Sequence, residues 1–70
     1  MTDLQRIKRI SALLMQSAIV GDLDEASDLI QQARDVRYGI KGSDAEYVAL
    51  LACITAQSDL TERIDAQAKA

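Results

Sequence analysis

Apolar residues recur at intervals of three and four along most of the chain, with polar residues between them, which is typical of amphipathic helices. The first stretch with this spacing contains Leu4, Ile7, Ile10, Leu14 and Ala18. Thr2 and Gln5 have the spacing of a capping box, S/T-x-x-E/Q. We therefore expect a helix over residues 3–20, and its apolar last turn, "AIV", predicts burial on more than one side.

The second stretch predicts a helix over residues 23–38, with apolar positions at Leu23, Ala26, Leu29, Ile30, Ala33 and Val36. Asp22 precedes Glu25 by three residues and is the expected N-cap. At the other end, Gly39 stands where a left-handed residue commonly stops a helix, and Ile40 takes the place of the hydrophobic contact in a Schellman motif. The segment "YGIKG" is thus interpreted as a helix stop.

The third stretch predicts a helix over residues 44–67, preceded by "SDAE", Ser43 to Glu46, which has capping-box spacing. Its apolar anchors are Tyr47, Val48, Leu50, Leu51, Ile54, Leu60 and Ile64. This helix is longer than the two preceding helices can cover. Its distal half is therefore expected either to fray in a monomer or to serve as an arm in a dimer.

The acidic stretch "GDLDEASDL" has two further interpretations besides a helix cap, namely a calcium loop and the turn of a helical repeat. A calcium loop that began at Asp22 would need an oxygen ligand at its fifth position, a glycine at its sixth and a glutamate at its twelfth. Those positions hold Ala26, Ser27 and Ala33, so the pattern argues against a calcium site. A cap at Asp22 with Asp24 and Glu25 near the positive end of the helix dipole accounts for the same acids.

The composition favours one small all-α domain over residues 1–70, built either as an antiparallel helical hairpin or as a three-helix bundle. Phe, Trp, Pro and His are absent, and one cysteine excludes an internal disulfide. Seventy residues bury a small core, so dimerisation is the expected additional source of stability. The sequence contains no run of 18 apolar residues, so it does not predict a membrane span. We expect a cytoplasmic protein with a reduced Cys53.

The charge balance and the residue types argue against several functions. A net charge of −3 disfavours direct nucleic-acid binding, which needs a basic face. Without histidine, acid–base chemistry would rest on exposed carboxylates, and Cys53 lies among apolar neighbours that suit a buried thiol better than a reactive one. "GIKGS" lacks the spacing of a phosphate-binding loop. We expect no enzyme activity, no metal and no cofactor.

Two candidate surfaces remain. Tyr and Arg are enriched at protein-binding hot spots, and several such residues gather around the loop after the second predicted helix. Asp28 is added to them because it is the one acid of "GDLDEASDL" without a role in capping. The expected partner-binding residues are therefore Arg34, Arg37, Tyr38, Ile40, Lys41, Tyr47 and Asp28. For each tyrosine, packing at a helix end is an equally good interpretation. A second set is expected to form the core or a dimer seam: Ile10, Leu14, Met15, Ile54, Leu60 and Ile64.

The segment "SAIVGDLDEASDLIQQARDV", residues 17–36, resembles the middle of a tetratricopeptide repeat. Gly21 and Asp22 match its turn, Ala26 and Ala33 its small positions, and Ile30 the bulky position between them. The resemblance implies an antiparallel pair of helices. The period does not recur, so the chain is not expected to form a peptide-binding solenoid.

In its size, its capped Ala-rich helices and its lack of histidine, the chain resembles small phage-encoded inhibitors of host regulators, of the quorum-sensing anti-activator type. This resemblance implies a homodimer that binds and disables another protein, such as a transcription factor. The alternative is a small helical co-chaperone or adaptor, of the secretion-system type, that holds a helix of its partner.

Overall fold

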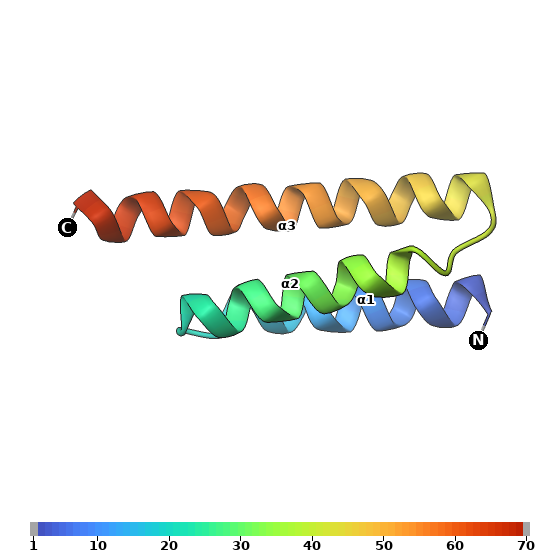
Figure 1. The fold of residues 1–70 in the computed structure, drawn as a ribbon, viewed down its shortest axis with the longest axis horizontal. Coiled ribbons are helices and arrows are strands. Elements are labelled where there is room, and N and C mark those ends of the chain that lie inside the picture. The colour runs from blue at the N-terminus through green and yellow to red at the C-terminus, as the bar shows by residue number, and fades with distance from the viewer. Residues whose placement is uncertain (1, 70) are drawn as a thin grey trace.

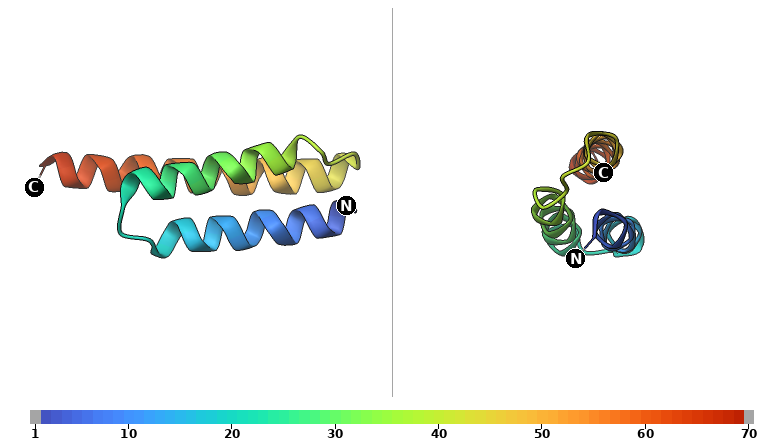
Figure 2. Two further views of the ribbon diagram at one scale, coloured as in Figure 1. Left: turned by 60° about the horizontal axis from the view of Figure 1, so that its bottom comes forward. Right: turned by 90° about the vertical axis from the view of Figure 1, so that its right-hand side faces the viewer.

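In the computed structural model the chain is all-helical, and residues 2–69 are described. Helix α1 spans Asp3–Ile19, α2 spans Leu23–Arg37 and α3 spans Ser43–Lys69. α1 and α2 form an antiparallel hairpin, and α3 runs back along both (Figure 1). Seen along their length, the helices occupy the corners of a triangle, and each contacts the other two (Figure 2). The all-α prediction is confirmed, in the form of three packed helices.

The two predicted caps of the hairpin are confirmed. The Thr2 hydroxyl accepts the Gln5 N–H at 3.2 Å, and the Gln5 side chain accepts the Thr2 N–H at 2.8 Å. One carboxylate oxygen of Asp22 accepts the N–H groups of Asp24 at 2.9 Å and Glu25 at 3.2 Å. Each contact satisfies helix-end amides that have no partner within the helix. α1 and α2 are consequently separate helices on either side of Gly21.

The end of α2 differs from the predicted Schellman motif, because no residue among 2–69 has a positive φ. Instead the Gly39 N–H donates to the Val36 carbonyl at 3.1 Å, and the Ile40 N–H donates to the Arg37 carbonyl at 3.0 Å. These 3₁₀-type hydrogen bonds, each between residues three apart, tighten the last turn and satisfy its carbonyls without a left-handed residue. Gly39 has another reason to be small: the Arg6 guanidinium occupies the position that a Cβ would take.

The predicted capping box at Ser43 is also wrong, because Ser43 is already the first residue of α3 and the Glu46 N–H donates to the Gly42 carbonyl. A distant carboxylate serves this connection instead. Asp3 accepts the N–H of Lys41 at 3.1 Å and the N–H of Gly42 at 2.9 Å. The Gly42 and Lys41 hydrogen bonds hold the pKa of Asp3 below its ordinary value. The start of α1 thereby fixes the loop that leads into α3.

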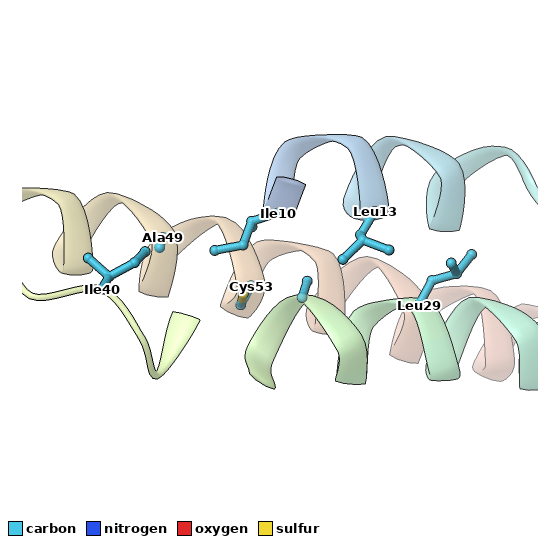
Figure 3. Packing of buried hydrophobic residues seen from close by; sticks show 7 residues of the cluster. Ile10, Leu13, Leu29, Ile40, Ala49 and Cys53 are labelled. Carbon is cyan, nitrogen blue, oxygen red and sulfur yellow. The ribbon is translucent and has the colours of Figure 1, made fainter. Parts of the chain in front are cut away.

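The core consists of small and aliphatic side chains on the facing sides of the three helices. Its larger part lies toward the open end of the hairpin and contains Ile10, Leu13, Leu29, Ala33, Ile40, Ala49 and Cys53 (Figure 3). A smaller part, toward the α1–α2 turn, contains Ala26, Ile30 and Leu60. Ala26 and Ala33 have no exposed surface, so these alanines allow α2 to lie close to its neighbours.

The last turn of α1 is not buried on several sides, contrary to the prediction from "AIV". Ala18 is exposed and Ile19 is 84 % exposed, whereas Val20 is half-buried. The turn is secured by a polar contact from α3: Arg63 donates to the carbonyls of Ser17 at 2.9 Å and Val20 at 2.6 Å. Beyond Arg63, α3 extends past the hairpin, and residues 64–69 are exposed (Figure 1).

Candidate functional site

The predicted contact residues lie mostly where the end of α2 meets the loop and the first turns of α3. Tyr38 and Tyr47 are 72 % and 62 % exposed, and Arg34 and Lys41 are exposed beside them. Asp28 lies apart from this corner, on the outward side of α2, about 9 Å along the helix axis from Arg34. The structure therefore brings four predicted residues to one corner and leaves Asp28 outside it.

Two further residues of that predicted set are engaged within the chain. Ile40 is buried in the core and so anchors the loop between α2 and α3. The Arg37 guanidinium lies 4.8 Å from the centre of the Tyr38 ring, and one of its nitrogens lies 3.9 Å from a Glu46 carboxylate oxygen. The Arg37 Nε is buried and has no hydrogen-bond acceptor among the described residues. Arg37 thus joins the end of α2 to the start of α3.

The predicted core or seam residues fall into two groups. Ile10 and Leu60 belong to the core, and Leu14 packs partly against it. Met15 is 71 % exposed, Ile54 is 55 % exposed and Ile64 is 46 % exposed. The exposed residues of this set are available to a partner, whereas the buried ones hold the three helices together.

An exposed apolar strip runs along the outward side of α3. It consists of Tyr47, Val48, Leu51 and Ile54, which are between 46 % and 62 % exposed. We call these four residues the outer ridge. They lie on the side of α3 opposite its buried stripe, which contains Ala49, Cys53 and Leu60. The sequence prediction treated the apolar residues of α3 as one set of anchors, so Val48 and Leu51 were not expected at the surface. The positions of these apolar residues around the helix axis separate them into two stripes.

Two grooves flank the outer ridge. The basic groove lies between α2 and α3, has a volume of about 380 Å³, and is lined by Arg34, Arg37, Leu50, Cys53, Ile54, Gln57, Ser58 and Thr61. Burial raises the pKa of the Cys53 thiol on its inner wall, while the charges of Arg37 and Arg34 act in the opposite direction. This thiol is consequently a weak nucleophile, and the groove presents positive charge beside apolar walls.

The apolar groove lies between α1 and α3 and has a volume of about 590 Å³. It is lined by Leu14, Met15, Ala18, Ile30, Leu51, Ala52, Thr55, Ala56, Asp59, Leu60 and Arg63. Its walls are mainly aliphatic, with one carboxylate and one guanidinium toward the end near the α1–α2 turn. Leu51 belongs both to the outer ridge and to the lining of this groove.

Residues 2–69 hold neither a metal-binding group nor a membrane-spanning helix. Within that range no three Cys, Asp or Glu side chains are grouped to hold a metal ion, and no helix is long and apolar enough to cross a membrane. The carboxylates lie chiefly at helix starts and on exposed sides, away from Cys53. No protein family, curated protein or solved structure matches the chain. The grooves and the ridge between them are accordingly the candidate functional surfaces.

Proposed function

We propose that this chain is a non-catalytic protein-interaction module that works as a small homodimer and disables a regulatory protein, such as a transcription factor, by binding it. The observation that carries the proposal is the apolar groove beside the exposed side chain of Met15. Apolar surface that stays open to water in a small protein marks an interaction site more often than a chance feature. The net charge of −3 opposes the competing idea that the chain itself contacts DNA.

The apolar groove suits an amphipathic helix of the regulator. Two nearly parallel helices, α1 and α3, form its walls, and a third helix laid between them would bury apolar anchors spaced three and four residues apart. Met15 is unbranched and adapts to the shape of what it contacts. Asp59 at the rim would favour a basic residue on the bound helix. Covering a helix that the regulator needs for its own assembly would disable it.

The exposed corner with Tyr38 and Lys41 offers a second contact area for the same partner. Tyr38 is 72 % exposed, and the Arg37 guanidinium lies over its ring. Tyrosine is enriched at binding hot spots, and the positive charge of Lys41 would favour an acidic surface on the partner. Replacing Tyr38 by Ala should weaken partner binding and leave the helix content unchanged.

A matched pair of variants tests the groove. The full chain is used as bait in a bacterial lysate, and the captured proteins are compared among wild type, Met15→Asp and Ile19→Asp. Both substituted residues are exposed on α1, but only Met15 lines the groove. We expect Met15→Asp to lose a regulator that wild type and Ile19→Asp retain. Equal capture by all three baits would contradict the proposal.

The second candidate function, an adaptor that holds a partner helix, uses the same groove and differs in its effect on the partner. Its supporting observation is the exposed apolar wall around Met15 and Ala18, which would shield a helix from water. The two functions are separated by assaying the captured protein. Loss of its DNA binding on addition of the chain supports the inhibitor, whereas retained activity with improved solubility supports the adaptor.

A further inference from the structure

The outer ridge is an exposed apolar strip outside the core, and of its residues Leu51 also lines the apolar groove. Tyr47, Val48 and Ile54 are each more than half exposed, and Leu51 is 46 % exposed. They occupy two consecutive turns of one helix, so their side chains form a continuous strip. A helix that is apolar on two opposite sides normally has partners on both. α1 and α2 cover one side of α3, and the other side contacts no other element among residues 2–69.

We propose that a second copy of this chain covers the outer ridge, with the two α3 helices antiparallel and crossing near Leu51. This inference rests on the homodimer of the proposed function and names its interface. The strip is apolar from Tyr47 to Ile54, and the same line then continues with the polar residues Ser58, Thr61 and Asp65. A two-fold axis must pass near the middle of a short apolar strip for apolar residues to meet one another. Leu51 holds that position.

In the resulting register, apolar residues of one α3 face apolar residues of the other. With the axis at Leu51, each Leu51 contacts the Leu51 of the second copy, and Val48 lies opposite Ile54. A parallel arrangement would also bring apolar residues together, but it would place the first turn of α3, with Asp44 and Glu46, beside the same acids of the second copy. The antiparallel arrangement avoids this repulsion and opposes the two helix dipoles.

The charges beside the ridge are complementary in the antiparallel register. Arg34 shares the basic groove with Gln57, Ser58 and Thr61. These turns of α3 lie opposite the acidic first turn of α3 in the second copy, where Asp44 is exposed. Within residues 2–69 one ion pair is closer than 4.0 Å, and it joins Arg37 to Glu46. Within that range Arg34 and Asp44 have no such partner, and the antiparallel register places Arg34 of one copy level with Asp44 of the other.

Sedimentation equilibrium of the full chain provides the first test, with matched variants Ile54→Gln and Ile19→Gln. Both isoleucines are exposed, but only Ile54 is on the outer ridge. Each dimer carries the substitution twice, so we expect Ile54→Gln to weaken self-association by about 30-fold or more, and Ile19→Gln to change it by less than about 3-fold. A wild-type chain that remains monomeric at about 100 µM would overturn the proposal. So would equal association of the two variants.

Crosslinking tests the direction of the two helices. In a Cys53→Ala background, a short bismaleimide should link Leu51→Cys chains efficiently, because both thiols lie at the two-fold axis. Asp65→Cys thiols lie on the same line of α3 as Leu51 and would be roughly 40 Å apart in the antiparallel register, so they should not be linked. Efficient linking at Asp65 would instead show parallel helices and overturn the register. Charge reversal adds a check: Arg34→Glu should weaken the dimer, and adding Asp44→Arg should restore most of the loss.

The same variants separate this inference from the proposed function. If Ile54→Gln is monomeric and still captures the regulator through the groove at Met15, the dimer interface is correct and dimerisation is not needed for partner binding. If the chain dimerises without dependence on Ile54, the interface is wrong, and the groove hypothesis is untouched. A ridge covered by a different protein would give a monomeric wild-type chain and a captured partner that is lost with Ile54→Gln.

Discussion

Asp3 shows how one side chain at the start of α1 determines the loop before α3. Its carboxylate accepts two backbone N–H groups, from Lys41 and Gly42, and these bonds lower its pKa. A carboxylate whose pKa is lower in the folded state than in the unfolded state stabilises the fold at pH values above the unfolded-state pKa. This stabilisation is lost as the pH falls through the folded-state pKa. The stabilisation should therefore be complete at pH 7, begin to decline near the ordinary Asp value of 3.8, and disappear once the pH is below the lowered folded-state pKa.

The variant Asp3→Asn tests this contribution. It keeps the size of the side chain but loses the charge, so we expect a lower urea midpoint at pH 7 than that of wild type. The two midpoints should converge only once the pH has fallen below the folded-state pKa of Asp3, which lies under 3.8, since wild-type Asp3 is then protonated as well. The exposed Asp28 provides the control, because Asp28→Asn should leave the midpoint at pH 7 unchanged. A constant difference between Asp3→Asn and wild type at all pH values would contradict the assignment.

Gly21 illustrates the opposite case, a residue whose special conformation is not used. No positive φ occurs among the glycines, and a Cβ added at Gly21 would meet no atom within 4 Å. Alanine reduces the conformational freedom of the unfolded chain without strain in the folded one. We expect Gly21→Ala to stabilise the protein by about 0.4 to 1 kcal/mol in urea denaturation. A destabilised variant would show that the turn between α1 and α2 needs the glycine.

At the scale of helices, Arg63 of α3 completes the end of α1. α1 has no basic residue in its own last turn, and the guanidinium of Arg63 donates to two of its terminal carbonyls. Removal of a charged donor from partly buried acceptors costs about 1.5 to 3 kcal/mol. We expect Arg63→Gln to lower the free energy of unfolding by about this amount, measured by urea denaturation. Arg63→Lys should restore only part of it, because one ammonium cannot reproduce the fork of a guanidinium.

Arg9→Gln is the matched control for Arg63. Arg9 is exposed on α1, and it has no hydrogen bond or ion pair within residues 2–69. Its replacement should change stability by less than about 0.5 kcal/mol. Equal losses for the Arg9 and Arg63 variants would mean that net charge, and not the contact between α3 and α1, is responsible.

For the molecule as a whole, stability and association should be linked. The core of one chain is small, with Ile10 as its largest completely enclosed side chain, and a second copy on the outer ridge would add buried apolar surface. A protein whose dimer is its most stable form melts at a temperature that rises with concentration. We expect an increase of about 3 to 5 °C for each tenfold rise in wild-type concentration. The melting temperature of Ile54→Gln should not depend on concentration in the same range.

The sequence by itself determined the helices and two of their caps. Spacings of three and four residues specify a helical pattern whatever the surroundings, and Thr2 and Asp22 act on amides two or three residues away. Local signals of this kind also placed Tyr38 and Lys41 at the surface of a loop. They could not decide the end of α2 or the start of α3, because Gly39 and Gly42 are constrained by Arg6 and Asp3 from another helix.

Only the tertiary structure decided which apolar residues of α3 are enclosed. Cys53 and Ile54 are adjacent and equally suited to a core, yet Cys53 is 4 % exposed and Ile54 is 55 % exposed. The difference is set by the direction from which α1 and α2 approach α3, which depends on packing between residues far apart in the chain. Periodicity therefore predicts that a helix has an apolar side. The arrangement of the three helices determines which side remains exposed for a partner.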